Sequence, residues 1–392
     1  MPLTGLTEGR SDLGRSLLER KALSSDWAPS FAAVPRAAFL PDVMWPFDMD
    51  DGTTVTVDRR ELPAMWQRFA DSDGPIVTQW DDGAADGPQR VPTSSSSMPS
   101  VVFRMLRDLG IEDGHRVLEA GTGTGWTAAL LAHRLGPDNV VSIEIDPEVA
   151  ATARRRLAGF GSDIQVLTGD GTWGDPDGAP YDRVSATFGL RRIPAAWLGQ
   201  TRPGGLIVAP WGTDYSNEDA VARLVVADDG RSASGTFTDP VEFMKARDQR
   251  RTFAGHRAYV PDGVAGADRS TTSVTGAELL GEGRFDARTF AAGLRVRDCY
   301  RLVATERDGA RPVWFYGLTD RSWACVMFRE GEPEATVWHS GPRSLWEEVV
   351  QALRWWQESG EPGYDRLGLT VTSDGTHQAW LDTPDDSWQL SP

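Results

Sequence analysis

The residues from Arg116 to Asp146 constrain the fold more than any other stretch of the chain. They begin with a short apolar run that ends at Glu119, pass through a turn rich in glycine and threonine, and show a helical pattern as far as Leu135. A second apolar run follows and ends on another acid, Glu144. A strand, a glycine loop, a helix and a strand that ends in an acid are typical of a nucleotide-type cofactor bound at the carboxyl edge of a parallel sheet.

The spacing of the glycines separates two kinds of cofactor. A dinucleotide-binding loop requires a third glycine three residues after the second, because the helix packs closely on the strand there. Trp126 occupies that position and would block the packing. The pattern instead reads E-x-G-x-G-x-G, which is expected for S-adenosylmethionine, a cofactor without a pyrophosphate. Its leading carboxylate can receive the cofactor's ammonium group or a water bound to it. The loop residues predicted to bind S-adenosylmethionine are Glu119, Gly121, Thr122, Gly123, Thr124 and Gly125.

Acids and glycines at the ends of the following strands agree with this cofactor. Glu144, followed by Ile145, ends the second strand and can accept hydrogen bonds from both ribose hydroxyls. Asp170 ends the third strand and can accept from the adenine amino group, while Gly171 lets the ring approach. Thr187 ends the fourth strand, where the adenine and substrate sites meet. Either acid alone could instead cap a helix, but their order on successive strands favours the cofactor site.

The alternation of strands and helices predicts the fold class. We expect an α/β protein with a doubly wound, mostly parallel seven-stranded sheet, as in class I S-adenosylmethionine methyltransferases, and an added C-terminal α+β domain. Its last two strands read as an antiparallel pair. The predicted division is an N-terminal helix and cover segment at 1–91, a methyltransferase core at 92–248, a linker at 249–285 and a tryptophan-rich domain at 286–392.

Three local features of the flanking segments are also predicted. Residues 6–28 form one amphipathic helix that packs on the sheet. In the last domain, Ser344 and Glu347 form a capping box at the start of a helix, and residues 367–382 close as a hairpin. The tryptophans of that domain serve its core, with one or two facing the substrate.

Composition excludes several classes of function. A formal net charge of −17 argues against nucleic acid as a partner, because binding phosphates requires clustered Lys and Arg. No apolar run approaches the length of a membrane helix, and the first residues lack the apolar core of a signal peptide, so we expect a cytoplasmic protein, as a monomer. The two cysteines are expected to be reduced, and the five scattered histidines have no ligand spacing, so no metal site is expected.

Several motifs resemble the protein-L-isoaspartate O-methyltransferase family. They are AVPRAAFLP from Ala33, the hydroxyl-rich run that ends at Met98, VLEAGTGTGWTAALLA, VVSIEIDPE, GDGTWGDPDGAPYDRV and LGQTRPGGLIVAPWG, in family order over residues 31–244. The resemblance implies methyl transfer from S-adenosylmethionine to a side-chain carboxylate, with S-adenosylhomocysteine as product. It also implies that Ser94 stands in the place of the hydroxyl that binds the acceptor carboxylate, with Ser95 as a second catalytic candidate and Thr93 and Met98 as substrate contacts.

The sequence departs from the family pattern in three places. The usual S-x-P-H/Y-M segment has become four serines and a methionine, and the stretch after the fourth strand has become TFGLRRIP. The latter places Arg191 and Arg192 near the presumed acceptor pocket. One hypothesis is that either arginine guides an acidic substrate, and the alternative is that both are simply solvated at the surface. The tryptophan-rich domain is an addition. This combination looks like long actinobacterial relatives that act on ribosomally synthesised, post-translationally modified peptides, in which an esterified aspartate of a macrocycle closes to an aspartimide.

Three functions remain open from the sequence. The first is the methyltransferase that acts on a modified macrocyclic precursor peptide. The second is an isoaspartyl protein-repair methyltransferase with an extra domain. The third is a non-catalytic module that binds a peptide, against which the intact glycine loop and strand-end acids argue. A carboxylate acceptor is already ionised at neutral pH, since the ordinary pKa of Asp is about 3.9, so neither methyltransferase needs a general base.

Overall fold

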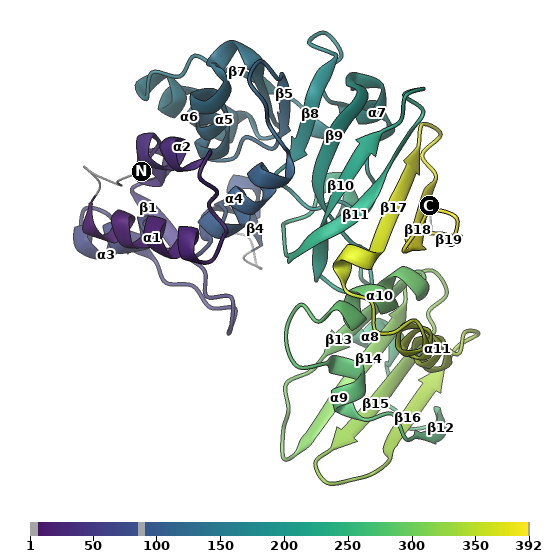
Figure 1. Ribbon diagram of the computed structural model, residues 1–392. Helices are drawn as coiled ribbons and strands as arrows, with labels where there is room; N and C mark the ends of the chain where they lie inside the picture. Colours follow the sequence, from purple (N-terminus) through teal and green to yellow (C-terminus); the bar gives the residue numbers. More distant parts are fainter. Residues whose placement is uncertain (1–6, 85–90, 391–392) are drawn as a thin grey trace. The chain divides into compact units, whose positions relative to one another are not determined.

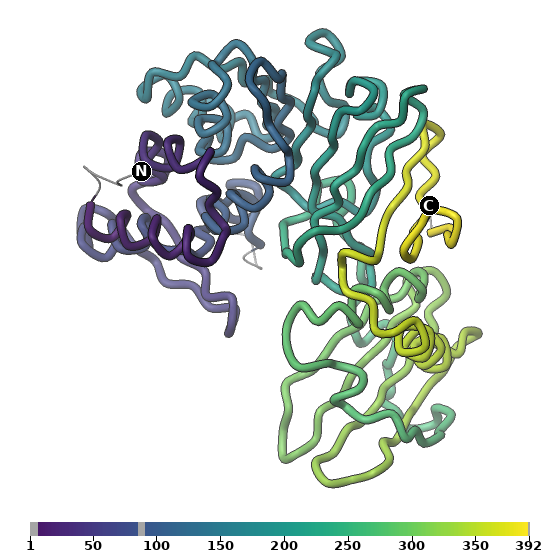
Figure 2. Tube along the Cα trace, in the orientation of Figure 1, coloured from purple at the N-terminus to yellow at the C-terminus, as the bar shows by residue number. Residues whose placement is uncertain are grey.

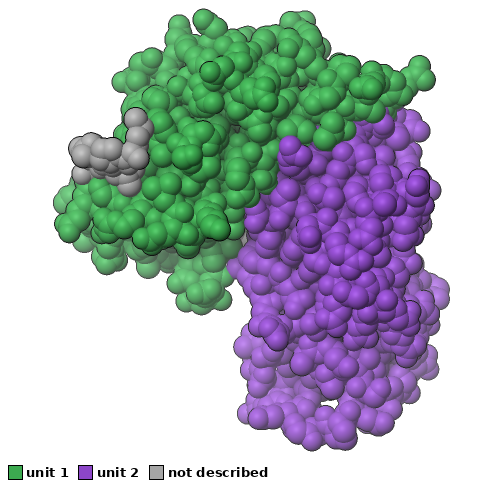
Figure 3. Space-filling model, in the orientation of Figure 1, with its two compact units in different colours: residues 1–188, 194–208, 225–231 green, residues 189–193, 209–224, 232–392 purple. Residues whose placement is uncertain are grey.

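The computed structural model of the protein describes residues 7–84 and 91–390. By its internal contacts the chain divides into two compact units, which are green and purple in Figure 3. The first comprises residues 1–188, 194–208 and 225–231, and the second comprises residues 189–193, 209–224 and 232–392. This division differs from the predicted domains, because most of 209–248 groups with the C-terminal part of the chain.

Parallel strands form the centre of the first unit (Figure 1). β5 pairs on one side with β6, which pairs with β7, and on the other side with β8, which pairs with β9. Every residue of β5 and β6 is buried, as expected for strands covered on both faces. The strands are β5 (Val117–Ala120), β6 (Val140–Glu144), β7 (Gln165–Thr168), β8 (Tyr181–Ala186) and β9 (Thr201–Trp211), and the connections contain α5 (Trp126–Leu135), η3 (Pro137–Asn139), α6 (Pro147–Gly159), η4 (Gly171–Trp173) and α7 (Ala195–Gln200).

A small antiparallel sheet in the order β2-β1-β3-β4 precedes this core. The predicted helix at 6–28 is shorter than expected, since α1 ends at Glu19 and its buried face is limited to Leu13, Gly14 and Leu17. The hydroxyl-rich run is not merely a lead into a helix, because its first five residues form β4. The elements are α1 (Glu8–Glu19), α2 (Ala28–Ala33), η1 (Arg36–Phe39), β1 (Val43–Pro46), β2 (Val57–Asp58), α3 (Pro63–Ala70), β3 (Ile76–Trp80), η2 (Asp81–Gly83), β4 (Pro92–Ser96) and α4 (Pro99–Asp108).

Within residues 7–84 and 91–390, the main sheet has ten strands rather than the predicted seven. Its order is β19-β18-β17-β11-β10-β9-β8-β5-β6-β7. The hairpin at 367–382 was expected to close the C-terminal domain, but β17 instead pairs antiparallel with β11, from Ser232 opposite Thr372 to Thr236 opposite Gly368. Figure 2 shows the chain leaving β11 and returning beside it as β17. The added strands are β10 (Asp219–Val226), β11 (Ser232–Val241), β17 (Leu367–Thr372), β18 (His377–Leu381) and β19 (Ser387–Gln389).

The hairpin joins β11 because an edge strand offers unpaired backbone groups to any strand that reaches it. Side chains support the pairing as well. The hydroxyls of Ser234 and Thr370 lie 2.7 Å apart across the two strands. Gly368 makes room for the ring of Trp380, since a Cβ at Gly368 would lie 2.1 Å from that ring. The hairpin at 367–382, which was expected in the C-terminal α+β domain, therefore belongs to the main sheet.

A separate five-stranded sheet lies between β11 and β17 in the chain. Its order is β12-β16-β15-β14-β13, and all of its pairs are antiparallel. The elements are η5 (Arg247–Gln249), α8 (His256–Tyr259), β12 (Asp268–Thr272), α9 (Gly276–Leu280), α10 (Ala287–Arg295), β13 (Cys299–Val303), β14 (Ala310–Gly317), β15 (Trp323–Arg329), β16 (Ala335–Ser340), α11 (Leu345–Glu358) and η6 (Tyr364–Arg366). The stretch 249–285, which was expected to be a linker, thus contains the edge strand β12 of this sheet and the short helices α8 and α9.

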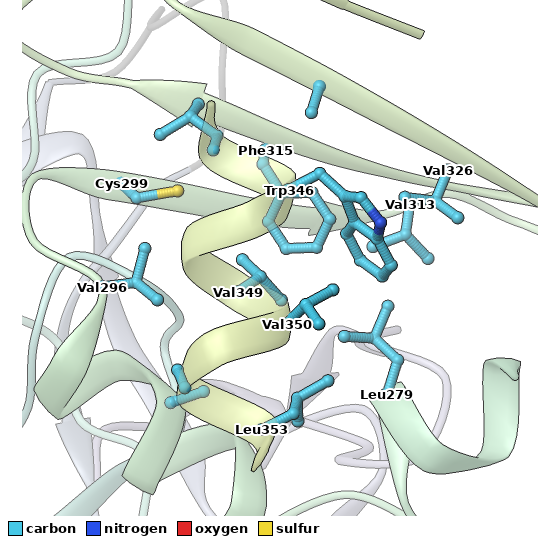
Figure 4. Close-up of a cluster of buried hydrophobic side chains, with 14 of the residues drawn as sticks. Leu279, Val296, Cys299, Val313, Phe315, Val326, Trp346, Val349, Val350 and Leu353 are labelled. Carbon is cyan, nitrogen blue, oxygen red and sulfur yellow. The ribbon is translucent and has the colours of Figure 1, made fainter. Parts of the chain in front are cut away.

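Helix α11 covers one face of the five-stranded sheet. Figure 4 shows Trp346, Val349 and Val350 of α11 against Phe315 and Val326 of the strands, and all of them are buried. Trp323, Trp346, Trp356 and Trp380 are each at most 5% exposed, which supports a core role for them. The predicted capping box at Ser344 is wrong, because its side chain makes no capping hydrogen bond; the capping box forms instead at α9, between Thr275 and Glu278.

Two other features are missing from the part of the chain that the structure describes. None of their helices is both long and apolar enough to cross a membrane. In the same residues, no three His, Cys, Asp or Glu side chains are grouped so that they could hold a metal ion. Cys299 and Cys325 are both buried and unbridged.

Candidate cofactor and acceptor site

The glycine loop between β5 and α5 has the conformation that only glycine adopts easily. Gly121, Gly123 and Gly125 have φ angles of +98°, +53° and +90°. A Cβ at Gly121 would lie 2.3 Å from the hydroxyl oxygen of Thr187, which donates its hydrogen to the carbonyl of Gly121. Thr187, predicted from the end of the fourth strand, therefore lies directly against the loop.

Trp126 begins α5 and fills the position that a dinucleotide loop would leave to glycine. Its ring is 3% exposed, and its Nε1–H donates to the carbonyl of Val34 at 3.2 Å. The guanidinium of Arg36 lies 5.8 Å from the ring centroid. The motif AVPRAAFLP is thereby connected to the start of the helix that follows the glycine loop.

Glu144 contacts the glycine loop directly. Its Oε2 accepts from the backbone N–H of Gly123 at 2.8 Å, and its Oε1 accepts from the backbone N–H of Asp146 at 3.1 Å. Asp146, not Glu144, caps α6 by accepting from Glu148 and Val149. The alternative that Glu144 is a helix cap is therefore wrong, and its carboxylate lies where a ligand over the loop would meet it.

Glu119 lies beneath the loop with no exposed surface. The hydroxyl of Ser142 donates to its Oε2 at 2.5 Å, and Thr122 lies 2.6 Å from the same hydroxyl. Its Oε1 has no hydrogen-bond partner within the described part of the chain. Burial raises the pKa of Glu119 to about 8, with the nearby carboxylate of Glu144 adding to the effect. A buried acceptor without a partner fits a role toward a cationic group bound above the loop.

Asp170 and Gly171 lie at the start of η4, after β7. Oδ1 of Asp170 accepts from the N–H and the hydroxyl of Thr172, at 2.9 and 2.8 Å, so this oxygen is a cap, as the alternative reading held. Oδ2 has no partner among the residues that the structure describes, and remains available to a ligand. A Cβ at Gly171 would lie 3.1 Å from the Cβ of Ala120, which keeps the backbone close to β5.

Two apolar side chains near these acids are exposed. Ile145, which follows Glu144, is 38% exposed, and Trp173, two residues after Gly171, is 73% exposed. Exposed large apolar side chains beside a loop are consistent with contacts to a planar ring. Trp173 was not identified from the sequence, because a lone tryptophan in a turn has no distinguishing pattern.

β4 brings the predicted acceptor hydroxyls to the glycine loop. A Cβ at Gly123 would lie 3.5 Å from the carbonyl oxygen of Ser95. Ser94 is 8% exposed, and its Oγ accepts from the hydroxyl of Thr78 at 3.2 Å. Met98 follows as the residue before α4 and makes no side-chain cap. The structure thus brings the serine run and the loop together.

Arg36 fixes the end of β4. Its guanidinium donates to the hydroxyl of Ser96 at 2.9 Å, to the carbonyl of Ser96 at 2.8 Å and to the carbonyl of Gly74 at 2.9 Å. Burial lowers the pKa of Arg36 to about 9. This arginine of the AVPRAAFLP motif, for which the sequence indicates no role, therefore holds β4 in place.

Gln79 connects β4 to the acids and was missed by the sequence analysis. Its Oε1 accepts from the hydroxyl of Thr93 at 2.9 Å, and its Nε2 donates to Oδ2 of Asp146 at 3.3 Å. The register between β3 and β4 shifts on both sides of Gln79, which is an irregularity that no local pattern reveals. The side chain of Gln79 therefore connects Thr93 to Asp146, and the backbone N–H of Asp146 in turn donates to Glu144.

The two predicted substrate arginines differ from each other. The side chain of Arg191 is 10% exposed, with its Nε 3.2 Å from Asp214 and its Nη1 3.7 Å from Asp219, so the alternative of solvation at the surface is wrong for it, and its role toward a substrate stays a prediction. Arg192 is exposed, and its backbone is bound by Gln249, which accepts from its N–H at 2.8 Å and donates to its carbonyl at 3.1 Å. Both belong to the second unit, and their placement beside the acceptor residues of the first unit stays a prediction.

The central part of the chain is similar to known methyltransferases. Residues 57–250 match the family described as "Protein-L-isoaspartate(D-aspartate) O-methyltransferase (PCMT)". A protein-L-isoaspartate O-methyltransferase of Ignicoccus hospitalis is 42% identical over 116 residues, which are 29% of this chain and 55% of that protein. One of Pyrococcus horikoshii is 37% identical over 147 residues, which are 37% of this chain and 66% of that protein. The first-ranked matches span about half the length of those relatives.

A solved protein-L-isoaspartate O-methyltransferase structure shares the fold. Its TM-score is 0.52 with 20% sequence identity, and the match covers 95% of this chain and all of that one. The match of residues 57–250 to a family of O-methyltransferases agrees with S-adenosylmethionine, the cofactor predicted from the glycine spacing.

Proposed function

We propose, on the premise that residues 57–250 belong with the protein-L-isoaspartate O-methyltransferases, that this protein esterifies a side-chain carboxylate of a peptide. The observation that carries the proposal is the approach of β4 to the glycine loop, where a Cβ at Gly123 would lie 3.5 Å from the Ser95 carbonyl. The serine hydroxyls of β4, which can bind a carboxylate, thereby lie beside the glycine loop, which would bind the methyl donor.

Residues of the first unit would hold S-adenosylmethionine, which supplies an electrophilic methyl group when bound. Glu144 would accept from the ribose hydroxyls, and Oδ2 of Asp170 from the adenine amino group, with Ile145 against the ring. The unpartnered Oε1 of Glu119 would accept from the ammonium group or from a water bound to it. A charged acceptor strengthens the hydrogen bonds of Glu144 and Asp170 relative to a neutral one.

Ser94 would orient the acceptor. Because Thr78 donates to its Oγ, the hydrogen of Ser94 is left to donate to a substrate carboxylate. One carboxylate oxygen then attacks the methyl carbon, the C–O bond forms as the C–S bond breaks, and the electron pair stays on sulfur. No base is needed, since the acceptor is ionised at neutral pH. Holding the two groups in line can supply about 7–11 kcal/mol of the barrier.

We infer an ordinary aspartate of a modified macrocyclic peptide as the substrate. The replacement of the family's P-H/Y pair by serines in the run that forms β4, and the second unit with its own sheet, favour a substrate different from that of the short relatives. After esterification the amide nitrogen of the next residue attacks the ester carbonyl, its proton is lost and methanol leaves, which closes a five-membered aspartimide. Isoaspartyl repair is the second candidate, and the names of the curated relatives favour it.

A competition between two peptides separates these candidates. The full chain is incubated with methyl-labelled S-adenosylmethionine and equal amounts of an isoaspartyl peptide and a macrocyclic aspartyl peptide, and both are followed by mass spectrometry. We expect label on the aspartyl macrocycle, followed by a loss of methanol. Label on the isoaspartyl peptide alone would establish repair instead.

A further inference from the structure

The five-stranded sheet of the second unit ends in an open edge strand, β12 (Figure 1). β12 pairs with β16 on one side, from Asp268 opposite His339 to Thr272 opposite Ala335, and it is the last strand in the order of the sheet. Its residues 268–271 are all exposed. An edge strand of this kind offers unpaired backbone groups to another extended chain.

The hydrogen-bond pattern of the sheet identifies the backbone groups of β12 that face outward. Between β14 and β15, the N–H of Gly317 donates to the carbonyl of Ser322 at 2.7 Å, so these residues form a hydrogen-bonded pair of the antiparallel ladder. Such pairs alternate along a strand, and a residue that bonds to one neighbouring strand does not bond to the other. Carried through the registers of β15 with β16 and of β16 with β12, this alternation points the N–H and C=O groups of Arg269 and Thr271 away from β16. These four groups have no hydrogen-bond partner in the part of the chain that the structure describes.

Arg269 and Thr271 present their side chains on the face of the sheet that α11 does not cover. Arg269 is opposite Trp338 in the register, and its guanidinium lies 5.9 Å from the centroid of the Trp338 ring. Trp338 and Trp314 of this face are only partly buried. Because side chains alternate between the faces along a strand, the registers place no Asp or Glu of the five strands on this face. The surface beside the open edge is therefore aromatic and cationic.

Charge complementarity at this edge favours an acid. Arg329, the other arginine on this face, lies 4.0 Å from Glu332, whereas Arg269 has no carboxylate partner among the described residues. The ring of Trp338 lies beneath its guanidinium, within cation–π distance. A carboxylate directly opposite Arg269 on an added strand would give this cation its partner, and opposite charges in that position stabilise a pair of strands.

A second copy of this chain does not supply that acid. When two such edges pair antiparallel, the outward-facing residues of one strand lie opposite the outward-facing residues of the other. In β12 and the residues that flank it, this set comprises Ala267, Arg269, Thr271 and Ser273. Arg269 would then face alanine, threonine, serine or another arginine, so the occupant that complements the edge is a different chain.

We propose that β12 is the docking edge for an extended, acidic peptide segment, which adds one antiparallel strand to this sheet. The residue opposite Arg269 is Asp or Glu, and the residue opposite Thr271 is aromatic or β-branched, as suits cross-strand packing. The backbone groups supply most of the affinity, and the acid supplies the selectivity. The site lies wholly within the second unit and needs no contact with the acceptor serines, so it goes beyond the proposed function.

The charge pair is tested by peptide binding to the full chain. The probe is a dye-labelled Thr-Tyr-Thr-Glu-Thr peptide with blocked ends, whose antiparallel pairing sets Glu opposite Arg269 and Tyr opposite Thr271, and its Kd is measured by fluorescence anisotropy. We expect Gln in place of the peptide Glu, or Arg269→Gln in the protein, to weaken binding about threefold, and the two changes together to weaken it no further. Arg155→Gln, at an exposed arginine of α6 in the first unit, is the matched control and should bind as the wild type does.

The backbone pairing is tested separately. Thr271→Pro removes an outward N–H that the fold does not use, and an edge strand tolerates proline there, so binding should weaken about tenfold with little change in melting temperature. Thr271→Val keeps that N–H and should bind as the wild type does. N-methylation of the peptide Glu, whose N–H points toward β12, should weaken binding as strongly, and N-methylation of the central Thr should not. The methylated peptides give this answer even where Thr271→Pro does not fold.

Three outcomes would overturn the proposal. Equal affinity for the Glu and Gln peptides would remove the acid from the account, and no binding of either, or equal tolerance of N-methylation at both positions, would remove the added strand. A dimer in sedimentation experiments that Thr271→Pro converts to a monomer would assign the edge to a second copy instead. None of these measurements uses methyl transfer, so they report on β12 whether or not the proposed function holds.

Discussion

Replacing Gln79 by methionine tests whether the acceptor strand and the cofactor acids are connected as the structure indicates. The change keeps the length of the side chain and removes both hydrogen bonds, one to Thr93 at 2.9 Å and one to Asp146 at 3.3 Å. A neutral hydrogen bond is worth about 0.5–1.5 kcal/mol and one to a charged group about 1.5–3 kcal/mol. The length of the second bond favours the low end, so the two together contribute about 2 kcal/mol.

We expect most of this loss in catalysis rather than in cofactor affinity. Glu144 keeps its own bonds to Gly123 and Asp146 in the variant, so the Kd for S-adenosylmethionine should stay within about threefold of the wild type. β4 loses its connection to these acids, so kcat/KM for the peptide should fall about tenfold, which corresponds to about 1.4 kcal/mol. Titration calorimetry and steady-state kinetics with labelled methyl donor measure the two quantities.

A second variant separates the two bonds. Gln79→Glu keeps an acceptor for Thr93 but places a carboxylate about 3.3 Å from Asp146, where two like charges repel by roughly 5 kcal/mol at an effective dielectric constant of 20. This repulsion raises the pKa of the two neighbouring carboxyl groups, at position 79 and at Asp146. At low pH the pair therefore takes up a proton, and this proton restores the hydrogen bond between the two side chains. Activity should therefore recover as the pH falls from 8 to 5.5, relative to the wild type at each pH.

The result that would refute this reasoning is a Gln79→Met variant whose kcat/KM lies within twofold of the wild type although its melting temperature falls. Gln79 would then stabilise the small sheet without positioning the acceptor. Gln357→Met, an exposed glutamine of α11 in the second unit, is the matched control and should change neither quantity.

Three further predictions concern single residues of the first unit. Ser94→Ala should lose most turnover, on the order of 100-fold in kcat, with unchanged S-adenosylmethionine affinity by calorimetry, and full activity would move the acceptor site elsewhere. Asp170→Asn keeps an oxygen for the η4 cap but removes the charged acceptor, so S-adenosylmethionine should bind roughly tenfold more weakly; wild-type affinity would refute the adenine contact. Glu119 has a pKa raised from 4.5 to about 8, so its protonated form stabilises the fold at low pH and this stability is lost as the pH rises from 4.5 through 8. Glu119→Gln should flatten that fall in urea-unfolding experiments, and an unchanged pH dependence would contradict it.

The parts of the fold that the sequence predicted are those in which neighbouring residues carry the signal. Glycines with positive φ, the acid at the end of β6 and the continuous apolar runs of buried strands are all local patterns. For the same reason the loop residues and Glu144 were placed correctly relative to each other. Asp170 was predicted to accept from adenine, but its Oδ1 caps η4, so only its Oδ2 remains available to a ligand.

The parts that could not be predicted depend on contacts between distant residues. Gln79 reaches Asp146 only because the β3–β4 register shifts at that point, and Ser142 reaches Glu119 only across two paired strands. The pairing of β17 with β11 joins segments about 130 residues apart, so the same hairpin pattern fits either sheet. Surface solvation of Arg191 stayed open as an alternative because nothing nearby in the sequence indicates Asp214 and Asp219 as its partners.

Location of the transferred methyl group tests the central claim most directly. The full chain is incubated with a carboxylate-bearing peptide and methyl-labelled S-adenosylmethionine, and the labelled residue is identified by fragmentation before and after mild alkali. We predict label on a side-chain carboxylate as an ester that alkali removes, and no label with the Ser94→Ala variant. Label that resists alkali, on nitrogen or sulfur, would contradict the account, as would S-adenosylmethionine binding without transfer to any carboxylate.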